Sequence, residues 1–151
     1  MELVDDRYPD AVLSDDRGRV DLDRVHAWLR EAYWCRGIPR ETIARAVEGS
    51  IAFGIYEGGV QVAFARAVTD RATYAWIADV IVAPESRGRG YGKWIVEAVL
   101  AHPELQGLRR IQLGTLDAHG LYAQYGFVPT AVPERFMEIV DRDVYQRGAA
   151  R

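Results

Sequence analysis

The sequence predicts a mixed α/β domain, and three features of the chain support this class. A mostly apolar run at residues 73–83 has the composition of a strand that is buried on both faces. It leads into a glycine-rich turn and then into a helical pattern. Two strand-like runs, residues 51–57 and 60–69, come before it and are joined through Gly58-Gly59, a strong hairpin signal. The length of 151 residues is typical of one domain.

The region before the hairpin predicts one short strand and two helices. Residues 11–14 suit an edge strand, and Asp21 suits the N-cap of a helix that runs to about residue 33. The helical pattern resumes at residues 41–48. The connection between the helices is unusual for a plain loop because it places two aromatic residues beside an arginine: Tyr33, Trp34 and Arg36. Trp34 either contacts a ligand or closes the core beneath the loop.

The glycine-rich turn is the strongest sign of a binding site. Pro84 cannot continue a central strand, so the ladder ends there. The glycines that follow permit positive φ and let another molecule approach the backbone. A helix that begins here presents bare N–H groups at the positive end of its macrodipole, which is an anion-binding arrangement. The sequence therefore predicts a ligand that carries phosphate. The glycines and the cationic side chains that add to the site are Gly88, Gly90, Gly92, Arg87, Arg89 and Lys93.

Two common phosphate-binding motifs do not fit this turn. A P-loop needs Gly, four residues, Gly-Lys and then Ser or Thr. Here Gly88 is one residue too close to Gly92-Lys93, and Trp94 stands where the hydroxyl belongs. A dinucleotide fingerprint needs a third glycine at the position that Lys93 occupies. Each alternative lacks a required group.

The remainder of the chain predicts further alternation of helix and strand. The turn leads into a helix that ends near residue 101, before Pro103. The later elements are a strand at 108–115, a short helix from Ala118, and two last strands at 128–132 and 135–140. We expect a single domain over residues 1–151, with residues 143–151 frayed.

Two residues carry reactive groups in apolar surroundings. Asp79 lies inside the predicted strand 73–83, where its carboxylate is expected to be partly buried. It is either a functional group aimed into a cleft or a structural carboxylate paired with the backbone or an arginine. Cys35 is the single cysteine, and nothing near it in sequence marks it as activated, so a small buried hydrophobe is the better interpretation.

Composition excludes several classes of protein. The net charge of −3 argues against a general nucleic-acid binder. One cysteine permits no internal disulfide and fits a reducing compartment, so we expect a cytoplasmic protein. No signal pattern or membrane-spanning apolar run is present, and we expect no membrane partner. One cysteine and three scattered histidines form no ligand cluster, so no metal is implied.

Two motifs together resemble those of the GNAT N-acetyltransferase superfamily. Arg87, Gly90 and Gly92 fill the acetyl-CoA signature R/Q-x-x-G-x-G/A, directly after a hydrophobic strand and before a helix. One strand later, residues 118–127 match A-x-x-L-Y-x-x-x-G-F. The resemblance implies a mixed, mostly antiparallel sheet of about six to seven strands flanked by about four helices. It follows the element order of nearly the whole chain but is specific only from Asp79 to residue 127.

The resemblance also implies roles for single residues. The tyrosine of the second motif, Tyr122, acts in the family as general acid beside the coenzyme sulfur. Asp79, His119 or water remain alternatives for the base, with Asp79 preferred. Thr115 stands where many relatives have an asparagine that contacts the pantetheine arm. The residues around the helix connection, Tyr33, Trp34 and Arg36, become candidate acceptor contacts. The implied coenzyme contacts are Val80, Ile81, Val82, Arg87, Gly88, Arg89, Gly90, Tyr91, Gly92, Lys93 and Thr115.

The activity implied is transfer of the acetyl group of acetyl-CoA directly to a primary amine, on a small molecule or a protein. The alternative is a non-catalytic sensor that binds acyl-CoA on the same fold. Both predict coenzyme A binding, and they differ in whether Tyr122 supports turnover. Because dimers are frequent among relatives, a homodimer is a further expectation.

Overall fold

The computed structural model describes residues 1–147, in which six strands form one sheet of order β1-β2-β3-β4-β5-β6. Neighbouring strands from β1 to β5 are antiparallel, whereas β6 is parallel to β5. The mostly antiparallel sheet expected from the resemblance is confirmed. The strands are β1 Glu2–Leu3, β2 Ala11–Ser14, β3 Ile51–Glu57, β4 Val60–Thr69, β5 Tyr74–Val82 and β6 Arg110–Gln112.

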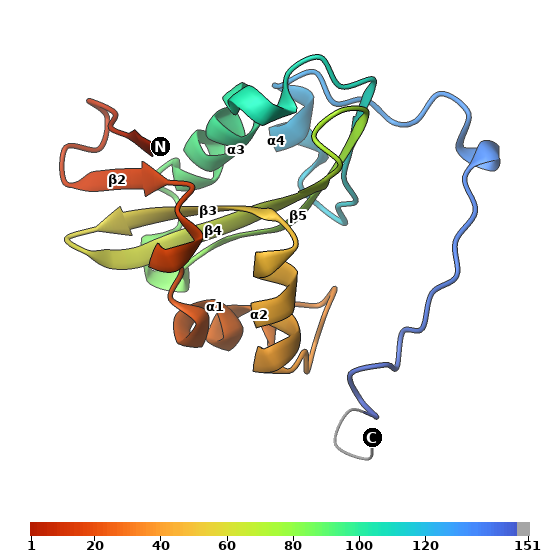
Figure 1. Ribbon diagram of the computed structural model, residues 1–151, viewed down its shortest axis with the longest axis horizontal. Coiled ribbons are helices and arrows are strands. Elements are labelled where there is room, and N and C mark those ends of the chain that lie inside the picture. The colour runs from red at the N-terminus through yellow and green to blue at the C-terminus, as the bar shows by residue number, and fades with distance from the viewer. Residues whose placement is uncertain (148–151) are drawn as a thin grey trace.

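Helices cover both faces of the sheet (Figure 1). Helices α1, Leu22–Leu29, and α2, Arg40–Glu48, lie on one face. Helices α3, Tyr91–Ala101, and α4, His119–Ala123, lie on the other. Each layer has its own apolar core, because α3 packs on the inward side chains of β3 to β5 while α1 and α2 pack on the opposite side of the same strands. The 3₁₀ turns are η1 Arg17–Arg19, η2 Pro84–Ser86, η3 Pro103–Leu105 and η4 Pro133–Arg135.

The strand β5 has a free edge where it runs toward the glycine-rich turn. It pairs with β6 only through Tyr74, Ala75 and Trp76. Beyond that point β5 continues to Val82 with no strand partner on this edge within residues 1–147. Unpaired N–H and C=O groups on such an edge are ready to bind another extended molecule. The parting of β5 and β6 therefore opens the sheet beside α3.

Several expected boundaries differ from the structure. The first helix ends at Leu29 rather than near residue 33, and residues 30–38 form turns that bring Gly37 to φ 82°. The expected strand at 108–115 is shortened to Arg110–Gln112. The strand β1 was not expected, because two residues carry no readable periodicity.

The two last strands, expected at residues 128–132 and 135–140, are a wrong prediction. Only the turn η4 interrupts an extended, unpaired course between residues 128 and 140. Pro129 and Pro133 lack the N–H that a ladder requires, which explains the first failure. Residues 136–140 do have alternating exposure, but no strand within residues 1–147 pairs with them.

The segment that we expected to fray is described only in part. Residues 148–151 lie outside the described residues. Residues 143–147 form a turn in which the N–H of Gln146 donates to the carbonyl of Asp143 at 3.0 Å. Tyr145 packs against the core under α1 and α2, and the side-chain amide of Gln146 donates to the carbonyl of Arg36 at 3.0 Å.

Candidate active site

The start of α3 is built as an anion site. Gly90 is its N-cap in the left-handed conformation, φ 94°, and supplies no side chain to cap the first N–H groups. The first turn contains no acidic residue, and Gly88 is also left-handed, at φ 78°. A helix of eleven residues with exposed amides at its positive end favours a negative ligand. The backbone at the start of α3 thus has the geometry that phosphate binding would require.

The N-terminal segment holds this turn in place through Tyr8. Its hydroxyl donates to the carbonyl of Arg89 at 2.9 Å, and its ring stacks on Trp94 with 5.2 Å between centroids. A Cβ atom added to Gly90 would lie 2.2 Å from the Tyr8 oxygen. Gly90 is therefore required both by its φ angle and by the close approach of Tyr8. No pattern in the sequence pointed to Tyr8.

The cationic side chains near the turn point in different directions. Arg87 reaches the first cavity described below, and its Nε donates to the carbonyl of Val82 at 3.2 Å. Arg89 instead pairs with Glu57 at 2.8 Å and lies over the ring of Tyr91. The side chain of Tyr91 is buried in the core, so only its backbone is available to a ligand. Lys93 is exposed and lines neither cavity.

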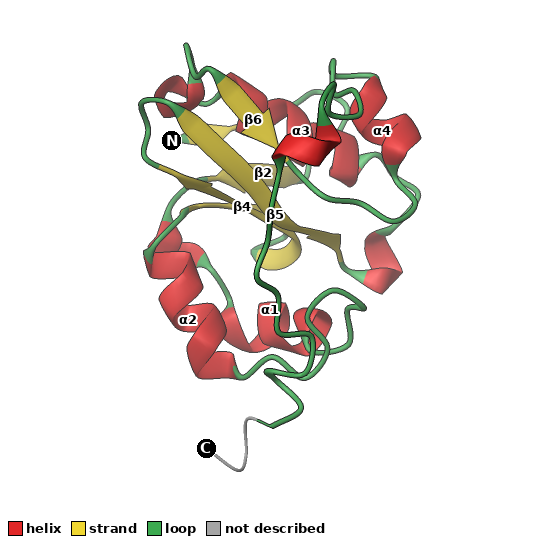
Figure 2. Cartoon of the chain, turned by 90° about the vertical axis from the view of Figure 1, so that its right-hand side faces the viewer, coloured by secondary structure: helices red, strands yellow, loops and turns green. Residues whose placement is uncertain are grey.

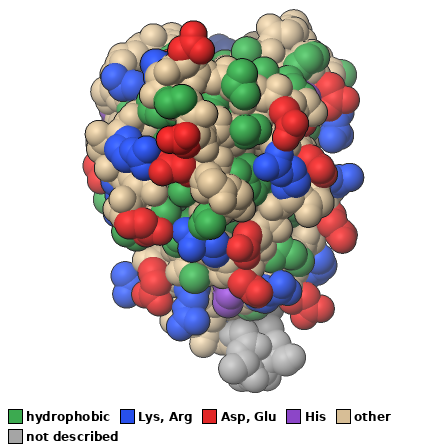
Figure 3. Space-filling model, turned by 90° about the vertical axis from the view of Figure 1, so that its left-hand side faces the viewer, with side chains coloured by type: hydrophobic (Ala, Val, Ile, Leu, Met, Phe, Trp, Pro, Cys, Tyr) green, Lys and Arg blue, Asp and Glu red, His purple; other side chains and the backbone are tan. Residues whose placement is uncertain are grey.

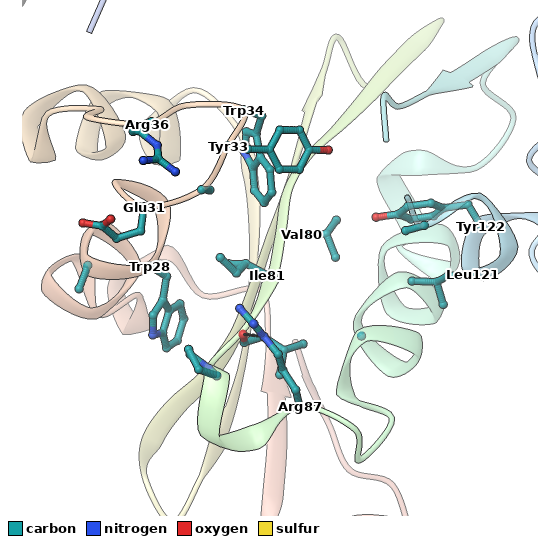
Figure 4. Close-up of a pocket in the computed structure, with 16 residues that line it drawn as sticks. Trp28, Glu31, Tyr33, Trp34, Arg36, Val80, Ile81, Arg87, Leu121 and Tyr122 are labelled. Carbon is teal, nitrogen blue, oxygen red and sulfur yellow. Dashed lines mark hydrogen bonds between the residues drawn. The ribbon is translucent and has the colours of Figure 1, made fainter. Parts of the chain in front are cut away.

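A first cavity of about 790 Å³ opens beside the free edge of β5 (Figure 4). It runs from Arg87 at the glycine-rich turn, past Val80 and Ile81, to Tyr122 on α4. Its walls are mainly apolar, and its volume suits a small organic ligand. The lining residues are Ala27, Trp28, Glu31, Ala32, Tyr33, Trp34, Arg36, Val80, Ile81, Val82, Pro84, Arg87, Gly92, Ala118, Leu121 and Tyr122.

A second cavity, of about 850 Å³, lies on the other side of Tyr122. It is more polar, and its walls come from β4, β5, the loop after β6 and the C-terminal segment. It shares with the first cavity the residues Tyr33, Trp34, Val80, Ala118 and Tyr122. Its other lining residues are Cys35, Ile38, Arg66, Trp76, Ile77, Ala78, Asp79, Leu113, Gly114, Thr115, Leu116, Asp117, Glu138, Arg142 and Tyr145.

Tyr122 stands at the wall that the two cavities share. Its hydroxyl points into the first cavity, across from Tyr33 and Val80 (Figure 4). The side chain is 9% exposed, and its hydroxyl forms no hydrogen bond with any other described residue. Burial raises the pKa of Tyr122 above 10.0, and the nearby Tyr33 raises it further. Tyr122 therefore keeps its proton at neutral pH and can donate it.

Asp79 is part of a three-residue cluster at the same wall. It is a non-glycine residue at φ 56°, beside the point where the β4–β5 register shifts between Phe64 and Arg66. Its carboxylate accepts from Arg66 Nε at 2.6 Å and from Trp34 Nε1 at 2.9 Å. Both members of the ion pair are largely buried. Arg66 was missed in the sequence, although a charge inside the otherwise apolar run 60–69 was an available signal.

The connection between α1 and α2 closes the site from the opposite side. Tyr33 and Trp34 meet edge to face, with 5.1 Å between centroids. The Tyr33 oxygen accepts from the N–H of Leu116 at 3.0 Å and so joins this connection to the loop after β6. Arg36 lies at the rim of the first cavity. Cys35 is buried, and burial raises its pKa to about 12, so it remains a thiol.

Two of the residues predicted from the sequence, Thr115 and His119, do not line the first cavity. Thr115 lines the second cavity, and its hydroxyl accepts from the N–H of Ala118, the residue just before α4, at 3.0 Å. His119 is exposed and lines neither cavity. Sequence reasoning missed Trp28, Leu121 and Trp76, which lie on a helix face or strand where an apolar residue looks like ordinary core.

Elsewhere on the described surface, a smaller cavity of about 390 Å³ around Asp15 and His102 shares no lining residue with the first two. Figure 3 shows acidic, basic and apolar side chains interspersed over the face opposite the C-terminal segment. Among residues 1–147 no group of three or more His, Cys, Asp or Glu side chains is placed to hold a metal ion. No helix in the described part of the chain is long and apolar enough to span a bilayer.

Fold and site together define a class of protein: an α/β domain in which an uncapped helix start and a free strand edge lie beside two adjoining cavities. Residues 15–127 match the acetyltransferase (GNAT) family. This match covers most of the chain, which belongs to that family and is an acyltransferase. The family uses acetyl-CoA, and the backbone amides, the free edge of β5 and the apolar first cavity fit that molecule.

Comparison with individual proteins agrees with this assignment. A solved structure of a candidate GNAT acetyltransferase from Xanthomonas campestris pv. campestris is 46% identical, covers 91% of this chain and 97% of its own, and superposes with a TM-score of 0.88. A candidate acetyltransferase of Gibberella zeae is 28% identical over 76% of this chain and 77% of its own. A Clostridium acetobutylicum structure determined with acetyl-CoA shares the fold at 16% identity, covering 86% and 94% of the two chains, TM-score 0.62.

Proposed function

We propose that this protein transfers the acetyl group of acetyl-CoA directly to a primary amine, with Tyr122 as general acid. The observation that carries the proposal is the meeting of the two cavities at Tyr122. One cavity leads from the anion site to this point, and the other reaches it from the more polar side. Two reactants that enter from opposite sides would be held together, which makes a bimolecular reaction effectively unimolecular.

The chain's own groups would position the first reactant. The amides at the start of α3 and the Arg87 guanidinium bind diphosphate, and the free edge of Val80-Ile81-Val82 binds extended amide groups. When bound, acetyl-CoA supplies an activated thioester carbonyl. An N–H of β5 is suited to stabilise negative charge on that carbonyl oxygen. Tyr122 holds its proton at the shared wall and gives it to the leaving sulfur.

On the acceptor side, Asp79 has a positioning role in this proposal. One carboxylate oxygen accepts from Trp34 and the other from Arg66, so Asp79 holds the Trp34 ring at the shared wall. That Asp79 is also the base that removes the proton from the incoming ammonium stays a prediction. The substrate contacts proposed for Tyr33, Trp34 and Arg36 rest on their places in the cavity walls. We further propose that residues 1–151 act as one domain in the cytoplasm.

The test combines coenzyme binding with turnover. Calorimetry should detect binding of acetyl-CoA and of free CoA, and a screen of amines, polyamines, amino acids and peptide N-termini should reveal an acceptor. Tyr122→Phe should keep CoA affinity and lower kcat by roughly 100-fold or more, as expected when a general acid is removed. The alkaline fall in wild-type kcat should begin above pH 10.0, because the pKa of Tyr122 is raised.

The matched control is Tyr125→Phe, since Tyr125 is on the same segment but bonds to Glu97 at 3.0 Å and lines neither cavity. Its turnover should be unchanged. Absence of CoA binding would reject the whole proposal. CoA binding without turnover on any amine would favour the sensor alternative instead.

A further inference from the structure

Four large side chains stay exposed around the second cavity, although much of each is apolar. Tyr33 and Trp34 are 55% and 44% exposed, and Trp76 and Leu116 are 40% and 70% exposed. All of them line the cavity. A single exposed apolar residue needs no explanation, but several that surround one hollow are a sign of a binding site. The second cavity therefore offers apolar walls to its ligand as well as polar ones.

The aromatic walls are held in fixed positions. The Trp34 indole donates to the Asp79 carboxylate at 2.9 Å, and the Tyr33 ring meets it edge to face. Trp76 lies against the loop after β6, where a Cβ atom added to Gly114 would be 3.6 Å from its ring. Rings that are already positioned lose little freedom when a ligand covers them. An apolar group that enters the cavity would thus bind at a low entropic cost.

The charged side chains of the cavity leave an excess of negative charge. Asp79 and Arg66 pair with each other at 2.6 Å and balance one another. Within residues 1–147, the side chains of Asp117, Glu138 and Arg142 form no hydrogen bond or ion pair. These unpaired groups are two carboxylates and one guanidinium. The cavity therefore favours a cationic ligand over one that also carries a carboxylate.

The unpaired charges belong to the part of the second cavity that the first cavity does not share. The segment after α4 crosses in front of β5 in Figure 2 and brings Glu138 and Arg142 to the second cavity. Trp76 and Leu116 also line this cavity and not the first. An acetyl acceptor must place its nitrogen beside Tyr122, at the wall that both cavities share. The rest of the acceptor then lies against the apolar side chains and the unpaired charges.

We infer, on the basis of the proposed function, that its acceptor is an arylalkylamine: a primary amine with one positive charge, no carboxylate and an apolar body the size of one aromatic ring. The amine nitrogen would form a C–N bond with the acetyl carbon as the C–S bond breaks. The nitrogen, which arrives as an ammonium, gives up two protons. One of them replaces the Tyr122 proton taken by sulfur, and the other goes to solvent.

Other amines fit these walls less well. A polyamine or an amino sugar carries further ammonium or hydroxyl groups along its length. Against the apolar surface of Trp76 and Leu116 those groups would lose water without gaining a hydrogen bond. An amino acid carries a carboxylate, which would approach Asp117 and Glu138. Each of these compounds is therefore a useful comparison in a test.

Steady-state kinetics of the full chain at saturating acetyl-CoA test the substrate class. The amines compared are 2-phenylethylamine, phenylalanine, spermidine and glucosamine. The kcat/KM for 2-phenylethylamine should exceed each of the others by about 10-fold or more, the discrimination expected when one ring is buried in an apolar site. An equal or higher value for any of the other three would overturn the proposal.

Leu116→Ala tests the apolar wall, and Trp76→Ala tests it a second time. Each should raise the KM for 2-phenylethylamine by about 5-fold more than the KM for methylamine, which has no ring to bury. Leu116 is 70% exposed, so its loss should leave the fold unaffected. The matched control is Val68→Ala, because Val68 is 40% exposed, lies opposite Trp76 in the sheet and lines neither cavity. Equal effects on both amines, or the same selective effect in Val68→Ala, would overturn the proposal.

Glu138→Gln tests the charge of the cavity. Removing one carboxylate should lower the preference for 2-phenylethylamine over phenylalanine by about 3-fold at low ionic strength, because less negative charge opposes the carboxylate of the amino acid. Glu134→Gln is the matched control, since Glu134 is exposed on the same segment and lines neither cavity. Its preference should equal that of the wild type. A preference that Glu138→Gln leaves unchanged would overturn the exclusion of acceptors that carry a carboxylate.

Calorimetry separates the acceptor class from the proposed activity. The CoA-loaded protein should bind 2-phenylethylamine, and Leu116→Ala should weaken that binding. Turnover on other amines without binding of 2-phenylethylamine would overturn the acceptor class and leave acetyl transfer standing. Binding of CoA and of 2-phenylethylamine without turnover on any amine would support the ligand class of the second cavity and reject the proposed function.

Discussion

The two cavities that meet at Tyr122 differ in the groups they offer to a ligand: main-chain groups in the first and side chains in the second. The first cavity relies on main-chain groups, namely the uncapped start of α3 and the free edge of β5. The second cavity relies on side chains that come from strands, loops and the C-terminal segment, including Arg66, Asp79, Trp76 and Glu138. One wall is thus set by backbone geometry and the other by side-chain chemistry.

This difference explains how each side can change in evolution and in the laboratory. Main-chain recognition requires only that certain positions stay small and left-handed, as Gly88 and Gly90 do. Side-chain recognition depends on the identity of every lining residue, so it can vary among proteins with one fold. Substitutions on the first side should therefore affect binding of CoA, and those on the second side should affect the acceptor.

The largest effect is expected for Gly90→Ala. The added Cβ would lie 2.2 Å from the Tyr8 hydroxyl and would require a left-handed non-glycine residue, so CoA binding should weaken by about 100-fold or more as the turn is displaced. Gly126→Ala is the matched control, because its φ of 92° carries the same backbone strain and nothing lies within 4 Å. Calorimetry should give it the wild-type CoA affinity. Equal losses in both variants would contradict this explanation.

Asp79→Asn should affect the second cavity, where the acceptor is expected to bind. It removes the charge that balances Arg66 and weakens the hold on Trp34, so KM for the acceptor should rise by about 10-fold while CoA affinity stays constant. Asp23→Asn is a control, since it breaks the exposed Asp23–Arg40 pair instead. If Asp79 is also the base, kcat at saturating acceptor should fall as well in Asp79→Asn; a raised KM alone would indicate positioning.

Gly92→Ala should separate stability from binding. Gly92 has no positive φ, and its added Cβ would meet only Val82 Cγ2 at 3.9 Å, on the wall of the first cavity. The helix should gain up to about 1 kcal/mol in unfolding free energy, while the methyl group narrows the cavity and weakens CoA by about 10-fold. Thermal melts should therefore show a higher melting temperature, and calorimetry should show a weaker affinity for CoA. Unchanged affinity would place the ligand away from Gly92.

The smallest effect is expected for Tyr8→Phe. The ring keeps its stacking on Trp94, and only the hydrogen bond to the Arg89 carbonyl is lost. A neutral hydrogen bond contributes about 1 kcal/mol, so CoA affinity should fall by about 5-fold. Turnover at saturating CoA should be unchanged. A loss confined to kcat would show that Tyr8 does more than fix the turn.

Much of the fold followed from local patterns. The strands β3 and β4 have the expected bounds, and Gly58 and Gly59 adopt positive φ as their hairpin requires. The helix α3 begins and ends where the glycine-rich turn and Pro103 predict. These elements were readable because the signals lie within a few residues of one another. The early end of α1 had no such local signal, whereas Pro129 did argue locally against the strand expected at 128–132.

The same distinction applies to the site. The left-handed, uncapped turn before α3 could be predicted from its glycines. The pairing of Arg89 with Glu57 and the hydrogen bond from Tyr8 to Arg89 could not. The aromatic pair at Tyr33 and Trp34 was recognisable as unusual, while its bond to Asp79 was not. A sequence shows which groups are available along the chain and does not show which of them face one another.

By itself, the sequence determined the order of helices and strands, the glycine-rich turn and the two family motifs, because propensity, periodicity and glycine freedom act over short stretches. Only the tertiary structure decided that β5 and β6 part beyond Trp76, that two cavities meet at Tyr122, and that Met137 and Ile139 face solvent. Those features are set by strand register and by packing between segments many residues apart, which no local pattern encodes.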